Sequence, residues 1–347
     1  MYREEKLAIP DELASGHIPE TIVYRDDEQD ALKDALSTTD LPNLYIHGPR
    51  GTGKTLLMKT GLHALPSNFK TCYISCIQFS TAYQVLRQTC RALEGKDVNA
   101  GHHTSHLQER IQDRLAECPL ALVLDDVGFL LNHDGGDLFY VLSRMENREN
   151  ASIFAISSNY ENPYPFVDDR VLSSLQPWYI TFRKYTAKEA YRILEERLRA
   201  AGLLDQVDRE ALTLIVATTR NIELGLQWLQ QAAATAEERI TESLLRNVKS
   251  AAAQRYRDLQ LKKFSRHHHT LLEAISQLTT ERNDDIFTGR IYDRYNELCQ
   301  GQPTEPLGHR RITDLLQHLE LLDLISVTHH PGGKQGQTRE IHITHFL

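Results

Sequence analysis

The segment 48–55 reads GPRGTGKT and constrains the fold more than any other part of the chain. It matches the pattern G-x-x-x-x-G-K-[ST] and lies between an apolar run at 43–47, which predicts a strand, and a helical pattern at 55–64. Glycines let successive backbone N–H groups face one anion, and the N-terminus of the following helix adds positive charge. We expect Lys54 to reach the β- and γ-phosphates of a nucleotide and Thr55 to ligate Mg²⁺. The predicted phosphate-binding residues are Gly48, Pro49, Arg50, Gly51, Thr52, Gly53, Lys54 and Thr55.

Short apolar runs alternate with helical patterns on the C-terminal side of this loop. The runs at 71–75, 120–124 and 152–157 are separated by helical spacing at 82–93, 107–115 and 138–144. Strands that are apolar throughout are typical of a parallel sheet covered by helices on both faces. The predicted fold class is therefore α/β, with the phosphate loop at the end of one strand.

Polar residues follow two of the predicted strands. Asp125 and Asp126 end the run at 120–124, and Asn159 follows the run at 152–157. Taken alone, these residues suit an ordinary solvated turn. Downstream of a phosphate loop they favour a catalytic interpretation, in which Asp125 ligates Mg²⁺ directly or through water, Asp126 acts as a base, and Asn159 orients the attacking water.

The chain after Pro177 is mostly helical and ends in a different pattern. Helical spacing covers 188–201, 208–218, 222–238 and 242–261, and 262–269 is expected to be a hinge. Three more helical stretches precede two short strands at 324–329 and 339–344, joined by the glycine-rich turn PGGKQGQ. Helices followed by such a hairpin fit a winged helix-turn-helix, which binds either duplex DNA or protein. The residues expected to contact DNA are Arg310, Arg311, Thr313 and His318 on helix 309–322, with His329, His330, Lys334 and Arg339 on the wing.

The order of these motifs resembles that of the AAA+ ATPases, and more narrowly that of the archaeal origin-recognition and cell-division-control (Orc/Cdc) replication initiators. The resemblance also rests on PE…YR at 19–25, DDRVLSSL at 168–175, TGRIYDRY at 288–295 and the segment 310–325. It implies a RecA-like AAA+ base at residues 1–180, a helical lid at 181–262 and a winged-helix domain at 263–347. It also implies ATP or ADP with Mg²⁺ as cofactors. Origin duplex DNA, a neighbouring initiator subunit and the replicative helicase are the implied partners, in the cytoplasm at the nucleoid.

The resemblance also assigns residues that the local pattern leaves open. It places Ile22, Val23 and Arg25 near the adenine. It makes Arg170 an arginine finger for a neighbouring subunit, although a loop arginine after two acids also suits a surface ion pair. An initiator-specific helical insertion falls at 84–106, where Arg87 and Arg91 are expected to contact DNA; the alternative is a solvated helix face.

Two departures from the family pattern concern hydrolysis. Asp126 stands where the family has glutamate, and losing one methylene retracts the carboxylate by about 1 Å. The lid motif Gly-Asp-x-Arg reads Arg220-Asn221-Ile222-Glu223, so Glu223 replaces the expected arginine, and Arg220 is the candidate substitute. Because misplacement of this size costs about a hundredfold in rate, we predict that nucleotide binds and that hydrolysis is slow or absent.

Composition narrows the remaining interpretations. A net charge of −8 excludes a basic field over the whole chain. The absence of an apolar signal region and of a long apolar run argues against export or a membrane span. The five cysteines contain no CxxC pair and are expected to be reduced thiols, and the adjacent residues His267–His269 do not suit a shared metal ion. The functional alternatives are a paralogous DNA-binding regulator, a plasmid or provirus initiator with a weak ATP site, or a AAA+ ATPase whose winged helix binds protein.

Overall fold

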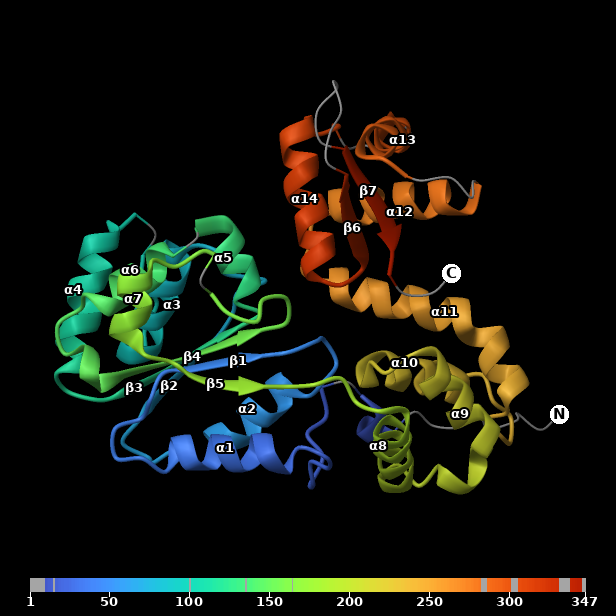
Figure 1. Cartoon of the computed structure of the whole chain (residues 1–347), viewed down its shortest axis with the longest axis horizontal. Coiled ribbons are helices and arrows are strands. Elements are labelled where there is room, and N and C mark those ends of the chain that lie inside the picture. Colours follow the sequence, from blue (N-terminus) through green and yellow to red (C-terminus); the bar gives the residue numbers. More distant parts are fainter. Residues whose placement is uncertain are drawn as a thin grey trace. The chain divides into compact units, whose positions relative to one another are not determined.

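The computed structural model describes residues 10–14, 16–99, 101–134, 136–163, 165–281, 286–300, 305–330 and 338–344. Backbone contacts divide the chain into two compact units (Figure 1). The first, here the sheet unit, comprises 16–197 and 219–222. The second, here the C-terminal unit, comprises 198–218 and 223–347 together with the first fifteen residues. The proposed lid boundary at 181 remains a prediction.

A five-stranded parallel sheet with the order β2-β3-β4-β1-β5 forms the sheet unit. Its strands are β1 (Leu44–His47), β2 (Lys70–Ser75), β3 (Leu120–Asp125), β4 (Ala151–Ser157) and β5 (Trp178–Thr181). The predicted parallel α/β class is confirmed. The sequence analysis missed β5, an edge strand of four residues in which Trp178, Tyr179 and Thr181 are exposed.

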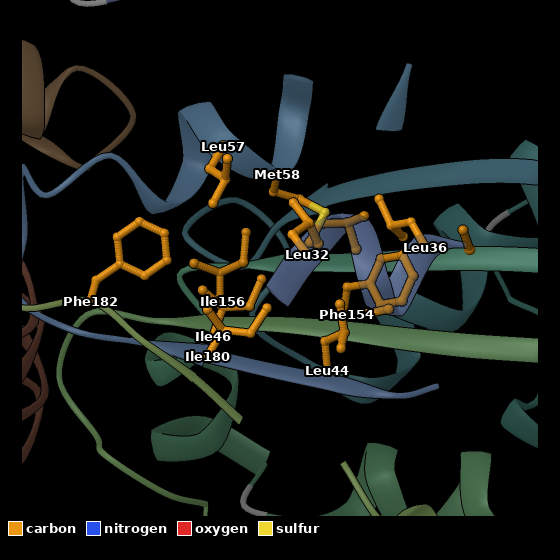
Figure 2. Packing of buried hydrophobic residues seen from close by; sticks show 13 residues of the cluster. Leu32, Leu36, Leu44, Ile46, Leu57, Met58, Phe154, Ile156, Ile180 and Phe182 are labelled. Carbon is orange, nitrogen blue, oxygen red and sulfur yellow. The ribbon is translucent and has the colours of Figure 1, made fainter. Parts of the chain in front are cut away.

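Helices cover both faces of this sheet (Figure 1). The helices of the first half of the chain are α1 (Asp26–Leu36), α2 (Lys54–Leu62), α3 (Ala82–Glu94), α4 (Thr104–Leu115), α5 (Gly128–Asp134), α6 (Asp137–Ser143), α7 (Asp169–Leu175) and α8 (Ala187–Ala200). Leu32 of α1 and Met58 of α2 pack against Ile46, Phe154 and Ile156 of the central strands (Figure 2). Each side chain buried in this way stabilises the fold by about 1.5–3 kcal/mol, so the apolar face of α2 anchors the phosphate loop that precedes it.

The C-terminal unit is helical before it ends in a hairpin. Its helices after α8 are α9 (Arg209–Thr218), α10 (Ile222–Ala233), α11 (Glu242–Leu261), α12 (Arg266–Glu281), α13 (Thr288–Gln300) and α14 (His309–Leu321). The Trp228 indole N–H donates to the Leu245 carbonyl at 2.8 Å and ties α10 to α11. The break between α11 and α12 is only four residues long, so the hinge expected at 262–269 is shorter than the pattern indicated.

The predicted wing is present as the antiparallel pair β6 (Ile325–His330) and β7 (Thr338–Ile343), in which Val327 lies opposite Ile341. Apolar residues at helical spacing on α12, α13 and α14 are buried against one another, including Leu271, Ile291 and Leu319. Three-residue 3₁₀ turns occur at Asp11–Leu13, Arg148–Asn150 and Leu204–Gln206. Within the described residues, no helix has the length and apolarity that a membrane crossing requires.

Candidate functional site

The phosphate loop connects β1 to α2 and depends on glycine at two points. Gly48 and Gly51 have φ of 147° and 71°, and a Cβ on Gly48 would lie 2.2 Å from the Phe182 carbonyl oxygen. A Cβ on Gly51 would lie 2.2 Å from the Asn221 side-chain oxygen. The two glycines therefore let Phe182, directly after β5, and Asn221 approach the loop backbone closely.

Lys54 begins α2 and points its ammonium back into the loop. Its Nζ donates to the Gly48 carbonyl at 2.6 Å and to the Pro49 carbonyl at 2.8 Å, and the residue is only 5% exposed. Burial lowers the pKa of Lys54 to about 7. A phosphate seated in the loop would favour the charged ammonium, so the site is built for an anion.

Asp125 ends β3 beside the start of α2. The Thr55 hydroxyl donates to the Asp125 carboxylate at 3.1 Å, and the Tyr73 hydroxyl of β2 donates to its Oδ2. Burial, followed by the neighbouring Asp126, raises the pKa of Asp125. A hydroxyl and a carboxylate side by side next to a phosphate loop are the donor set that Mg²⁺ takes in nucleotide sites, so these residues fit the ion.

Asp126 lies at the turn after β3 and faces the phosphate loop. Arg50 Nη2 is 3.0 Å from Asp126 Oδ1, and the two side chains are 10% and 20% exposed. The backbone of Asp126 is in the left-handed region, at φ of 54°, and its N–H donates to Asp125 Oδ1 at 3.1 Å. The fold thus joins a phosphate-loop cation to the predicted base, a contact that the sequence did not indicate.

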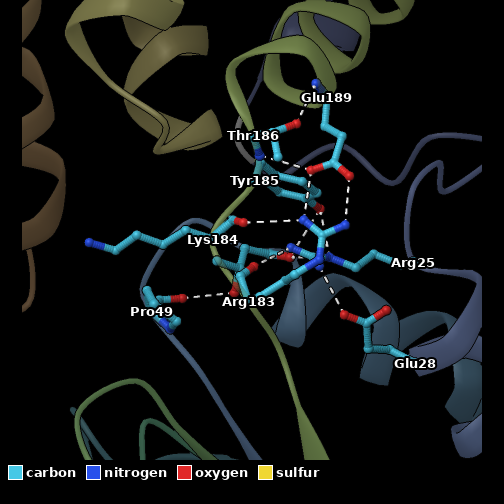
Figure 3. A network of polar contacts seen from close by, with 9 residues as sticks. Arg25, Glu28, Pro49, Arg183, Lys184, Tyr185, Thr186 and Glu189 are labelled. Carbon is cyan, nitrogen blue, oxygen red and sulfur yellow. Dashed lines mark hydrogen bonds and ion pairs between the residues drawn. The ribbon is translucent and has the colours of Figure 1, made fainter.

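A buried arginine, Arg25, lies beside Tyr185 and Glu28 (Figure 3) and contacts the backbone of the phosphate loop. Arg25 is 1% exposed; its Nε donates to the Thr52 carbonyl and to the Tyr185 hydroxyl, both at 3.1 Å. The Tyr185 hydroxyl donates in turn to the same Thr52 carbonyl at 3.0 Å, and Glu28 pairs with the guanidinium at 2.9 Å. Arg25 therefore contacts the loop backbone in this structure, and Tyr185 is a supporting residue that sequence reasoning missed.

A cavity of about 470 Å³ lies beside this network, and no phosphate-loop residue lines it. Its walls include Tyr24, Asp26, Tyr179, Arg183 and Glu189. Arg183 pairs with Glu189 through two hydrogen bonds of 2.8 and 2.6 Å, and this pairing lowers the pKa of Glu189 to about 2 (Figure 3). The residues predicted near the adenine, Ile22 and Val23, are half-buried just before this region.

The remaining predicted nucleotide residues lie at strand ends and in the segment 219–222. Asn159 is exposed two residues beyond β4, and Arg170 is exposed in the first turn of α7. Among the described residues, the guanidinium of Arg170 has no hydrogen-bonding or ionic partner. Arg220 is exposed, whereas Glu223 accepts a hydrogen bond from Gln260 at 3.1 Å. The residue of this motif that lies next to the phosphate loop is Asn221.

The residues predicted for DNA contact differ in how free they are. Arg310 and Arg311 are exposed in the first turn of α14, and the Thr313 hydroxyl donates to the His309 carbonyl at 3.1 Å. Arg87 donates through Nε to the Val98 carbonyl at 2.8 Å, whereas Arg91 forms a surface pair with Asp97. Arg339 is half-buried on β7; Lys334 lies outside the described residues, as do the side chains of His329 and His330.

His318, which was expected to contact DNA, packs against His268 of α12. Its Nδ1 lies 3.1 Å from His268 Nε2, and the two rings stack at 13°. Burial, and to a smaller extent the neighbouring His318, lowers the pKa of His268 to about 4. No group of three or more potential His, Cys, Asp or Glu metal ligands occurs among the described residues, and the five cysteines are free thiols.

Comparison with known proteins gives matches over both ends of the chain. Residues 21–156 match the AAA ATPase domain model, and residues 260–345 match the CDC6 C-terminal winged helix domain model. The ORC1-type DNA replication protein 1 of Methanothermobacter thermautotrophicus is 30% identical, over 93% of this chain and 90% of the relative. The protein of the same name from Sulfurisphaera tokodaii is 29% identical, over 99% and 90%.

Solved structures of related proteins also match this chain over nearly its whole length. The ORC1 protein of Aeropyrum pernix in complex with DNA matches with a TM-score of 0.74 and 26% identity, over 96% of this chain and 93% of that chain. Cdc6p from Pyrobaculum aerophilum matches with a TM-score of 0.62 and 15% identity, over 98% and 95%, and supports the fold alone.

Proposed function

The chain belongs to the family of ORC1-type DNA replication proteins, and on that premise we propose that it is a nucleotide-switched initiator that binds origin repeats in duplex DNA. One observation carries the nucleotide half of the proposal. The fold brings Lys54, Thr55 and Asp125 together at the carboxyl end of the sheet, with a carboxylate and a hydroxyl 3.1 Å apart. The start of α2 supplies Lys54 and Thr55, and the end of β3 supplies Asp125, so a glycine-rich turn alone would not explain them.

The bound nucleotide is ATP or ADP with Mg²⁺. The loop N–H groups and Lys54 hold the phosphates, and Thr55 and Asp125 hold the ion. When bound, Mg²⁺ supplies positive charge to the β- and γ-phosphate oxygens. Ile22 and Val23 lie toward the adenine, and Arg25 acts through the Thr52 carbonyl that it supports.

Hydrolysis is proposed to be slow. Asp126 is short for a base and is already paired with Arg50 at 3.0 Å. Asn159 orients the water, and the exposed Arg170 reaches the γ-phosphate of a neighbouring initiator subunit. A slow reaction suits a switch, because the bound state then lasts long enough to set the conformation of the protein on DNA.

The DNA half of the proposal places α14 in the major groove. Arg310 and Arg311 extend from its exposed first turn toward bases or phosphates, with Thr313 beside them. Arg339 of β7 and Lys334, which lies outside the described residues, are proposed to contact the DNA backbone, and Arg87 and Arg91 to contact it from α3. The match to the Aeropyrum pernix ORC1 protein, which was solved in complex with DNA, supports DNA binding in general. Acting at an origin would place the protein at the nucleoid, where it would also help to load the replicative helicase.

The two departures at Asp126 and Glu223 favour one alternative. A paralogous regulator, or an initiator of a plasmid or provirus, would keep the nucleotide only as a structural switch. Glu223 accepts a hydrogen bond from Gln260 and cannot supply the positive charge of the arginine expected at this position, which agrees with that alternative. The distinguishing observation is where the protein binds in the genome: at a repeat-rich chromosomal replication origin or at other sites.

The test measures binding of the full chain to labelled duplexes carrying inverted repeats, at several salt concentrations, with ATP, with ADP and without nucleotide. We expect Arg310→Ala with Arg311→Ala to lower the affinity more than tenfold and to reduce the salt slope by about two. Arg255→Ala, an exposed arginine of α11, is the matched control and should change neither. Binding that ignores sequence, or that survives the double substitution, would reject the initiator assignment.

A further inference from the structure

Arg50 and Asp126 form a mostly buried ion pair inside the proposed nucleotide site. The two atoms lie 3.0 Å apart, and each side chain exposes a fifth of its surface or less. Pairs shielded from water interact more strongly than surface pairs, and a competing charge is needed to separate them at low cost. The pair is therefore a defined state of the site rather than a transient surface contact.

Asp126 is held in place by hydrogen bonds of the backbone on both sides of it. The Cys76 N–H donates to the Asp125 carbonyl at 2.8 Å, and the Val127 N–H donates to the Ile156 carbonyl at 2.9 Å. The Asp126 N–H itself donates to Asp125 Oδ1. Since the backbone around Asp126 is attached to β2 and β4, the carboxylate has little freedom to move. The long arginine side chain is the part of the pair that can change partner.

The charged groups near the phosphate loop indicate which kind of ligand would displace Arg50 from Asp126. In this structure Arg50 pairs with Asp126, and Lys54 interacts with both Asp125 and Asp126. A γ-phosphate brought next to Lys54 adds negative charge within reach of Arg50 and competes with Asp126 for the guanidinium. ADP lacks that group and so does not supply this competing charge.

We propose that Arg50 senses the γ-phosphate by exchanging Asp126 for it, and that Asp126 becomes free to act on water only when ATP is bound. This inference rests on the proposed nucleotide function. It makes Arg50 a specificity-determining residue for ATP over ADP. It also means that the Arg50–Asp126 pair keeps Asp126 from acting on water whenever the γ-phosphate is absent. Guanidinium suits this exchange, because it binds carboxylate and phosphate oxygens in the same planar geometry.

The test compares four full-length proteins: the parent, Arg50→Gln, Asp126→Asn and the double variant. Affinities for ATP and ADP are measured by displacement of fluorescent mant-ADP, with Mg²⁺ present. We expect Asp126→Asn to raise the ATP affinity about tenfold and the ADP affinity much less, because the competitor for Arg50 is gone. Arg50→Gln should lower the ATP-to-ADP affinity ratio about tenfold, and the double variant should behave like Arg50→Gln.

Two results would overturn the proposal. One is an Asp126→Asn variant whose ATP-to-ADP ratio equals that of the parent; the other is an Arg50→Gln variant that loses affinity for both nucleotides equally, as a purely structural pair would predict. Thermal unfolding of the nucleotide-free proteins shows which variants are folded, and Arg50→Lys replaces Arg50→Gln if the latter is not. Failure of the proposed function looks different: the parent would then bind neither nucleotide, or would bind both as well with Lys54→Ala.

Discussion

The side-chain oxygen of Asn221 lies 2.2 Å from the position that a Cβ on Gly51 would occupy. Gly51 is in the phosphate loop and Asn221 is in the segment where the family's lid motif falls. A side chain on Gly51 cannot be accommodated unless the Asn221 side chain or one of these two segments moves. The close approach therefore links the shape of the loop to the residue that follows Arg220.

Substitution of Gly51 by alanine should abolish tight nucleotide binding. The added methyl collides with Asn221, and φ of 71° is costly for alanine. We expect at least a tenfold loss of ATP affinity in a titration with fluorescent nucleotide. Gly95→Ala is the matched control, because Gly95 has φ of 68° and open space around it. That control should lower stability by about 1 kcal/mol and leave the affinity unchanged; equal affinities for the two variants would contradict the role given to Asn221.

Removal of the Tyr185 hydroxyl should weaken the support of the loop. Tyr185→Phe leaves the Thr52 carbonyl with one donor fewer and Arg25 with one acceptor fewer. We expect a loss of about 1–2 kcal/mol in the free energy of unfolding, measured with urea, and a several-fold weaker nucleotide affinity. Tyr140→Phe removes a hydroxyl from an exposed tyrosine and should stay within about 0.5 kcal/mol of the parent. A Tyr185→Phe protein as stable as Tyr140→Phe would show that the hydroxyl is dispensable.

Acid should destabilise the winged-helix region through His268. Burial lowers the pKa of His268 to about 4, below its ordinary value near 6.5, so the unfolded chain takes up the proton first. Its contribution to stability is present above pH 6.5 and is lost as the pH falls toward 4, by about 3 kcal/mol in total. Urea unfolding at pH 7.5, 6 and 5 measures this loss. His268→Asn should flatten the profile, while His269→Asn, at an exposed neighbour, should preserve it; parallel profiles for both variants would refute the assignment.

Lengthening the proposed base should speed hydrolysis. Asp126→Glu restores one methylene and brings the carboxylate about 1 Å closer to the γ-phosphate. We expect single-turnover ATP hydrolysis to increase about tenfold or more, and Asp126→Asn to remove the residual rate. Nucleotide affinity measured in parallel separates a change in chemistry from a change in binding. A parent protein that already hydrolyses ATP rapidly, or an Asp126→Glu variant no faster than the parent, would count against the short carboxylate as the cause.

The two arginines of α3 should respond differently to truncation. Arg91 is 58% exposed and pairs with the exposed Asp97, an interaction that contributes little to stability. Arg91→Ala should therefore leave stability unchanged and lower the salt slope of DNA binding by about one. Arg87→Ala should cost about 1 kcal/mol of stability, because the Val98 carbonyl loses its donor. Equal DNA binding by the parent and Arg91→Ala would show that α3 does not contact the duplex.

Local patterns in the sequence were sufficient for the elements that carry the site. The glycine spacing predicted the turn between β1 and α2, because only glycine readily takes the positive φ found at Gly51 and Gly53. Apolar runs predicted β3 and β4, and the glycine-rich turn between two strands predicted the wing. Each of these signals depends on backbone preference or side-chain periodicity over a few residues. The sequence analysis missed β5, which is four residues long with three of them exposed.

The contacts inside the site were decided by tertiary structure. Arg50 meets Asp126 across 76 positions and Arg25 meets Tyr185 across 160, while His268 meets His318 across 50. Parallel crossovers and helix packing bring these partners together, and no local pattern states which way a long side chain will point. The chain sequence by itself determined that a phosphate loop, an acidic strand end and a winged helix exist. Only the fold decided that Arg50 pairs with Asp126 and that Asn221 lies next to Gly51, because those relationships depend on how segments far apart in the sequence pack together.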